Sequence, residues 1–100
     1  MNNLKNQNIT DNEKSKTLEN LKIVCSNCTK CELAKTRTNV VFSDGNPNAK
    51  IMLIGEAPGH NEDMRGIPFV GRAGQLLDMF LEEHKISRKN DLYICNILIF

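Results

Sequence analysis

The sequence lacks the apolar segments that membrane or exported proteins carry. No stretch approaches the ~18 consecutive apolar residues of a membrane-spanning helix. The first ten residues, MNNLKNQNIT, are polar and do not contain the apolar core of a secretory signal. We therefore expect a soluble cytoplasmic protein that has no membrane partner.

The sequence also lacks a strong net charge and internal repeats. Thirteen basic and 12 acidic residues leave a net charge of +1, which neither indicates nor excludes a nucleic-acid-binding face. The 100 residues are 40% hydrophobic and 25% charged, as is ordinary for a globular protein. This length allows one small domain with a modest core.

The first half of the chain has weak structural signals. Residues 1–16 are polar and predict a flexible tail, so that the domain would span residues 17–100. Thr17 could cap a short helix over Leu18–Val24. Three further elements are expected, namely a helical turn, a strand and a turn at Glu32–Thr36, Val40–Phe42 and Asp44–Asn48.

The second half predicts a strand, a helix and a second, parallel strand. The continuous apolar run Ile51–Ile54 is typical of a strand that is buried on both faces. Apolar residues recur at helical spacing from Ala73 to His84, and Leu92–Phe100 reads as another buried strand. A domain that stops within a wholly apolar strand is unusual. The pattern therefore indicates an α/β domain truncated after its second core strand.

A glycine-rich stretch lies between the first of these strands and the helix. Residues 55–74 read GEAPGHNEDMRGIPFVGRAG, and open α/β sheets bind ligands where a strand ends in such a loop. The alternative is a mere connection. A phosphate site is disfavoured, because neither common phosphate-binding glycine spacing occurs and the acids of the loop would repel phosphate.

Three of the four cysteines are clustered. Cys25, Cys28 and Cys31 have the two-residue spacing that lets thiolates converge on one metal ion or cluster. The alternative is a turn of reduced cysteines that binds no metal or binds zinc adventitiously.

The stretch from about Cys28 to Asn96 resembles the iron–sulfur (family four) uracil-DNA glycosylases. The resemblance is carried by GEAPG, by the following Glu-Asp pair and by GIPFVGRAGQLLD. It implies part of a three-layer domain with a parallel sheet. It also implies base-excision DNA repair, by hydrolysis of the N-glycosidic bond of uracil in DNA. It covers only the N-terminal half of such a domain.

The resemblance assigns roles within the loop and the second strand. Phe69 matches the aromatic residue that stacks on the base, and Asn96 matches the asparagine that reads its edge. Gly55 contributes backbone to the uracil pocket. Glu56 and Glu62 match acidic positions, one of which would orient the attacking water; we favour Glu56. Asp63 is expected to cap the loop.

The resemblance also implies a [4Fe–4S] cluster. Cys28 and Cys31 match its first two ligands, and Cys25 is additional. The third ligand position falls on Phe100, and the fourth lies beyond the end of the sequence. Cys95 should point away from Asn96, because neighbouring strand residues face opposite ways. We therefore expect an incomplete cluster, zinc or no metal.

The second signature of the family, a His-Pro-Ser-like segment with a catalytic histidine, has no counterpart in these residues. We therefore expect the chain to be inactive alone. A complementing C-terminal half, or self-association through Leu92–Phe100, could cover its apolar strand. Two alternatives remain open: a small metal-binding or interaction module, and a non-functional relic of a glycosylase.

Overall fold

The computed structural model describes residues 10–99 and contains one small sheet. Its strands are β1 (Ser43–Gly45), β2 (Ile51–Gly55) and β3 (Leu92–Asn96), arranged in the order β1-β3-β2. β2 and β3 are parallel, as predicted, whereas β1 runs antiparallel to β3. The sheet is therefore mixed rather than wholly parallel.

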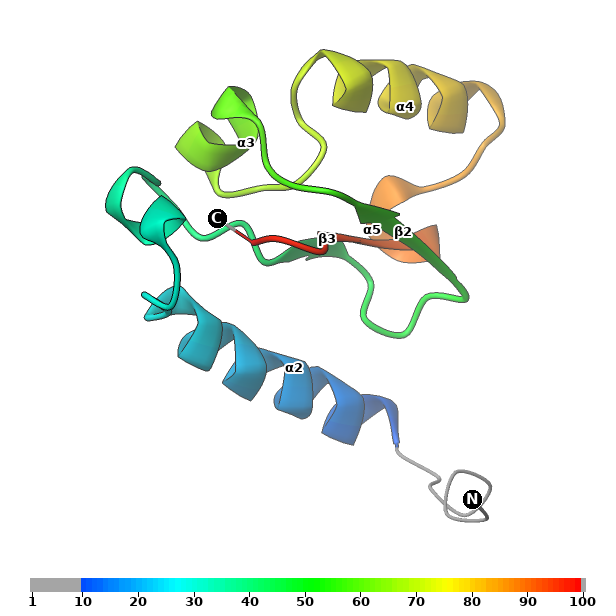
Figure 1. The fold of residues 1–100 in the computed structure, drawn as a ribbon. Coiled ribbons are helices and arrows are strands. Elements are labelled where there is room, and N and C mark those ends of the chain that lie inside the picture. Colours follow the sequence, from blue (N-terminus) through cyan, green and yellow to red (C-terminus); the bar gives the residue numbers. More distant parts are fainter. Residues whose placement is uncertain (1–9, 100) are drawn as a thin grey trace.

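Helices lie on both sides of this sheet. Figure 1 shows α2 on one side and α3 and α4 on the other, which gives the expected layered α/β arrangement. The helical elements are α2 (Asp11–Ser26), η1 (Glu32–Lys35), α3 (His60–Arg65), α4 (Arg72–Glu83) and α5 (Arg88–Asp91). The short turn expected at residues 32–36 is confirmed as η1. No helix in the described part of the chain is both long and apolar enough to span a membrane.

The first helix begins earlier than predicted. Thr10 is its N-cap, and the Thr10 hydroxyl accepts a hydrogen bond from the Glu13 N–H at 3.1 Å. Thr17, the predicted cap, lies inside α2 and donates its hydroxyl to the Glu13 carbonyl at 2.9 Å. The prediction of a flexible tail is therefore wrong for residues 11–16, and its remainder, residues 1–9, lies outside the described residues.

The first strand also differs from its prediction. Val40–Phe42 was expected to be extended, but β1 uses Ser43–Gly45, which the sequence placed largely in a turn. Gly45 permits this shift, since its φ is 100° and an added Cβ would lie 2.2 Å from the Leu92 carbonyl oxygen. The close approach of β1 to β3 therefore requires a glycine here.

The expectation that β2 is buried on both faces is wrong. Ile51, Met52 and Ile54 are 49%, 55% and 60% exposed, and Leu53 is the β2 residue that packs against the core. Among the described residues β2 is an edge strand. Met52 and Ile54 share one of its faces, which is uncovered.

Helix α4 confirms the predicted helix to within one residue at each end. Its Leu81 is buried, but Leu76 and Phe80 of the same predicted apolar face are exposed. His84 caps the C-terminus, where its Nδ1 donates to the Phe80 carbonyl at 2.8 Å and its ring stacks on that of Phe80. The imidazole thereby serves one of the last carbonyls of α4, which have no partner within the helix.

The core lies between α4 and the central strand. Leu81, Leu92 and Ile94 form its buried cluster, and partly buried side chains pack against it, namely Leu53, Phe69, Leu77 and Ile86. β3 alternates buried and half-buried residues up to Asn96. The expected strand Leu92–Phe100 therefore ends four residues early, and its last residue lies outside the described residues.

Ile94→Ala should destabilise the domain by about 2–5 kcal/mol, because the Ile94 side chain is fully buried and its loss leaves a cavity. Ile97→Ala is the matched control, since Ile97 is 76% exposed and its truncation should change stability by less than about 0.5 kcal/mol. Urea unfolding followed by circular dichroism measures both. Equal effects of the two variants would contradict this assignment of the core.

Candidate functional site

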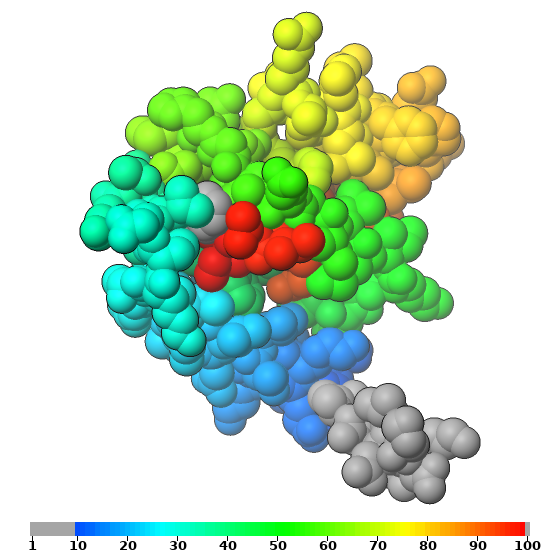
Figure 2. All heavy atoms as spheres, viewed as in Figure 1, coloured from blue at the N-terminus to red at the C-terminus, as the bar shows by residue number. Residues whose placement is uncertain are grey.

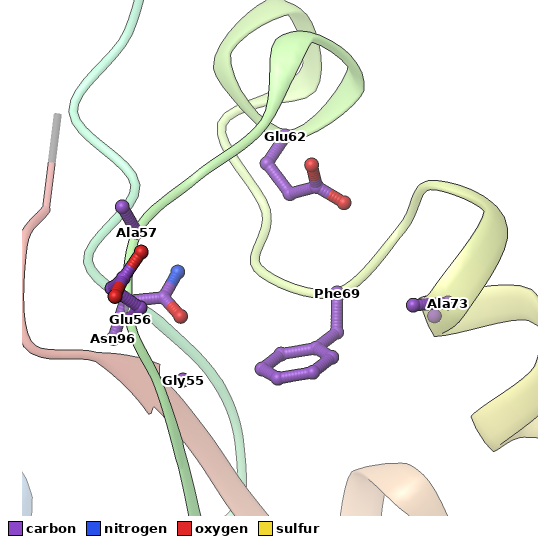
Figure 3. Close-up of a pocket in the computed structure, with 8 residues that line it drawn as sticks. Gly55, Glu56, Ala57, Glu62, Phe69, Ala73 and Asn96 are labelled. Carbon is purple, nitrogen blue, oxygen red and sulfur yellow. The ribbon is translucent and has the colours of Figure 1, made fainter.

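A pocket opens where the two parallel strands end. Gly55 and Asn96, the last residues of β2 and β3, are partners in the ladder. The pocket holds about 170 Å³, less than the roughly 300–1,000 Å³ of sites for drug-sized ligands. Its lining, drawn in Figure 3, consists of Gly55, Glu56, Ala57, Glu62, Phe69, Ala73, Gly74 and Asn96. A ligand the size of a single small ring suits this space.

Asn96 supplies the pocket's neutral hydrogen-bonding group. The residue is only 9% exposed, yet its side-chain amide makes no hydrogen bond with another described residue. Its amide atoms are not among the side-chain atoms that are shut off from water without a partner, since they border the pocket. The Asn96 amide is therefore available for a ligand, with one donor group and one acceptor.

Gly55 allows the backbone to approach both walls of the pocket. A Cβ at this position would lie 2.3 Å from Asn96 Oδ1 and 2.9 Å from the Phe69 ring carbons Cε2 and Cζ. No side chain fits between these groups. Gly55 thus lets the Asn96 amide and the Phe69 ring face the same small space (Figure 3).

Phe69 belongs both to the core and to the pocket. Its ring packs against the buried cluster, and it also forms the wall opposite Asn96. The Phe69 φ is 55°, which is uncommon for a residue with a side chain. Gly74 of α4 packs directly on this strained turn, since a Cβ there would lie 2.0 Å from the Phe69 carbonyl oxygen.

Glu62 holds the two ends of the glycine loop together. Its Oε1 accepts the Gly59 N–H at 2.9 Å, and its Oε2 accepts the N–H groups of Val70 and Gly71 at 2.9 and 2.6 Å. Desolvation would raise the pKa of Glu62, but the hydrogen bonds led by that of Gly71 outweigh it and lower the pKa below its ordinary value. Both oxygens of the Glu62 carboxylate therefore already accept hydrogen bonds from the backbone.

Glu56 differs from Glu62 in its surroundings. It follows directly after β2, is exposed, and makes no side-chain hydrogen bond with the described residues. Glu56 is one of the residues that line the pocket (Figure 3). Of the two acids, Glu56 is therefore the one with free acceptors.

Asp63 has a structural role, as expected, but its carboxylate caps the segment after η1 and not the glycine loop itself. Its Oδ1 accepts the backbone N–H groups of Thr38 and Asn39 at 2.8 and 2.9 Å. The bond from Asn39, supported by that from Thr38, lowers the pKa of Asp63. Asp63 thereby ties α3 to the segment that follows η1.

The cysteines do not form a metal site by themselves. Within residues 10–99, no three His, Cys, Asp or Glu side chains gather closely enough to hold an ion. Cys25 is the next-to-last residue of α2, and Cys28 and Cys31 follow in the turn before η1. Burial raises the pKa of the Cys95 thiol, which disfavours the thiolate that metals bind. The described residues therefore do not fit a complete iron–sulfur cluster.

Arg88 is a residue of the site that sequence reasoning missed. Its guanidinium donates to the carbonyls of Pro68 and Phe69 and pairs with Asp44 and Asp78. The sequence showed Arg88 only as part of a polar connection between helix and strand. A signal was available in Ser87 and Asp91, which cap a helical turn there: the Ser87 Oγ accepts the Asn90 N–H, and Asp91 Oδ2 accepts the Ser87 N–H.

Comparisons with known proteins agree with this geometry. The model of the uracil DNA glycosylase superfamily matches residues 42–100. The type-4 uracil-DNA glycosylase of Thermotoga maritima is 52% identical over 71 residues, which are 71% of this chain and 36% of that protein. That of Archaeoglobus fulgidus is 51% identical over 71% of this chain and 35% of its own length.

A third relative extends the match toward the N-terminus. The type-4 uracil-DNA glycosylase of Sulfurisphaera tokodaii is 44% identical over 82 residues, which are 82% of this chain and 37% of that protein. This chain therefore spans little more than a third of the length of the curated relatives that it matches.

Glu62→Gln should lower stability at pH 7 by about 1 kcal/mol, a modest effect because the carboxylate is partly exposed. The pKa of Glu62 is lower in the folded chain than its ordinary value of 4.5, so its contribution is complete above that pH. It is lost as the pH falls through the folded pKa, where wild type and variant should converge.

Glu56→Gln is the matched control and should leave stability at pH 7 unchanged, because the Glu56 carboxylate makes no hydrogen bond with the described residues. Urea melts between pH 3 and 7 test the pair. A loss of stability in Glu62→Gln that persists undiminished in acid would show that its carboxylate charge is not what holds the loop.

Proposed function

This chain belongs to the uracil DNA glycosylase superfamily, and we propose that its pocket binds uracil turned out of DNA during base excision. The observation that carries the proposal is the side-chain amide of the largely buried Asn96, which has no partner among the described residues and faces the Phe69 ring across the pocket. A planar heterocycle with polar edges satisfies both walls.

The chemistry of uracil suits these two walls. One edge of uracil presents an N–H donor beside a carbonyl acceptor, and the Asn96 amide offers the complementary acceptor and donor. Phe69 would stack on the face of the ring. The Gly55 backbone lets the base come close to the strand end, which no larger residue would permit.

Glu56 and Glu62 would have different roles. Cleavage of an N-glycosidic bond needs a positioned water and a group that stabilises the developing sugar cation. We assign the orientation of this water to Glu56, which lines the pocket and whose carboxylate makes no hydrogen bond with the described residues. Glu62 instead serves the scaffold, because three backbone N–H groups already occupy its oxygens.

The proposal covers base recognition by this chain, not cleavage by it alone. The resemblance places a catalytic histidine in a second signature that these 100 residues lack. It also assigns Cys28 and Cys31 as two of four cluster ligands, and thiolates from elsewhere would have to complete that set. A cluster of this kind would supply structural support through these cysteines.

The exposed apolar surfaces of the described residues suit a partner that would cover them. Ile97 and Leu98, which follow β3, are 76% and 44% exposed, and the Met52–Ile54 face of β2 is uncovered. Leu92 and Ile94 are buried, so they are not available to a partner. We propose that this surface binds a complementing half-domain or, without one, a second copy of the chain.

Asn96→Ala should weaken uracil binding about tenfold or more, because two hydrogen bonds are lost. Titration of the labelled chain with uracil, followed by NMR, measures the dissociation constant. Asn27→Ala is the matched control, since the Asn27 side chain donates to the Ile23 carbonyl of α2, away from the pocket. Equal uracil affinity of wild type and Asn96→Ala would contradict the proposed recognition.

An excision assay tests the division between recognition and cleavage. Purified chain with single-stranded DNA containing one uracil should release no base above background. Release by the wild type that Glu56→Gln abolishes would show that this chain cleaves by itself.

Self-association should depend on the exposed face of β2. Ile54→Lys places a charge on this 60% exposed apolar position and should shift the chain toward monomer in sedimentation velocity. Ile23→Lys, at a 58% exposed position of α2, is the matched control. If wild type is monomeric at high concentration, or if both variants behave alike, the β2 face does not mediate self-association.

A further inference from the structure

The short segment of residues 68–71, which carries Phe69, is held from two sides by opposite charges. Glu62 accepts the N–H groups of Val70 and Gly71, at the end of the segment. Arg88 donates to the carbonyls of Pro68 and Phe69, at its start; the bond to Phe69 measures 2.8 Å. The Glu62 carboxylate thus accepts hydrogen bonds from the amides of one strained turn, and the Arg88 guanidinium donates hydrogen bonds to its carbonyls.

We propose that Arg88 is the positioning residue that keeps the Phe69 ring at the pocket. The left-handed backbone of Phe69, with φ at 55°, is unfavourable for a residue with a side chain and persists only where its surroundings enforce it. The two carbonyls that flank this conformation are the ones that Arg88 holds. Without them the turn can relax, and the ring would leave the wall opposite Asn96.

The surroundings of Arg88 fix its guanidinium in place. Its side chain is 18% exposed, and it pairs through Nε with Asp44 at 3.0 Å and through Nη1 with Asp78 at 2.9 Å. Asp44 belongs to β1 and Asp78 to α4, so the sheet and the helix both orient the same cation. The planar fork can meet two carboxylates and two carbonyls together, which a lysine ammonium cannot do with the same geometry.

The structural part of this inference is independent of any ligand. Its consequence for base binding rests on the proposed function, since it assumes that the Phe69 ring stacks on uracil. The two parts can be tested on the same sample, because the ring position and the uracil affinity have separate signals.

The test is fluorine NMR of the full chain labelled with 4-fluorophenylalanine. Phe69→Leu identifies the Phe69 resonance, and the resonances of Phe42 and Phe80 report on the rest of the fold. Arg88→Lys and Arg88→Met should displace or broaden the Phe69 signal and leave those of Phe42 and Phe80 in place. Uracil titration of the same samples should give a dissociation constant about tenfold higher than that of wild type.

Arg72→Met is the matched control, because Arg72 is an exposed arginine at the start of α4 and should leave every resonance unchanged. If Arg88→Met fails to fold, Arg88→Lys decides, since it keeps the charge between Asp44 and Asp78. A Phe69 signal that stays in place in Arg88→Lys, or that moves only together with those of Phe42 and Phe80, overturns the inference. If wild type binds no uracil, the proposed function fails, while the Phe69 signal still decides the role of Arg88.

Discussion

The parallel pairing of β2 with β3 is the constraint on which the site depends. It brings Gly55 and Asn96 into register at the same edge of the sheet, although 40 intervening residues separate them in the sequence. Parallel strands cannot be joined by a tight turn, so the crossover must carry a helix and a long loop. That crossover supplies the opposite wall of the pocket, including Phe69.

The loop in this crossover is ordered by charge rather than by extensive burial. Glu62 in α3 accepts three backbone N–H groups of this loop, those of Gly59, Val70 and Gly71. Its neighbour Asp63 accepts those of Thr38 and Asn39 and so ties the loop to the segment after η1. Arg88 serves the carbonyls of the same loop from the other side. Backbone groups that a glycine-rich segment cannot pair with itself thus find charged partners, which are stronger than neutral ones.

The surface of the domain exposes many apolar side chains. Exposed apolar side chains extend over β2, α4 and the residues that follow β3, while the buried cluster has three members. Such a core supports only modest stability. The residues that line the pocket nevertheless lie close together, because they come from the ends of β2 and β3 and from the crossover between these strands.

Local pattern determined much of this molecule. Helical spacing placed α4 to within a residue, the apolar runs located β2 and β3, and the motif around residues 55–74 indicated the pocket. Pattern failed where distant groups decide the outcome. Burial of β2 depends on which elements cover it. The start of α2 was missed for a local reason, because its cap at Thr10 lies within a polar stretch. The position of β1 depended on a close approach between Gly45 and Leu92.

The candidate site likewise has features that the sequence indicated and features that only the fold revealed. The sequence by itself indicated Gly55, Glu56, Phe69 and Asn96 as candidates for base recognition, through its resemblance to the glycosylases, and all four line the pocket. Only the tertiary structure decided that Glu62 is bound by the backbone and Glu56 is free, and that Arg88 holds the turn at Phe69. Hydrogen bonds between residues 8 to 44 positions apart make those assignments, and such contacts exist only once the chain has folded.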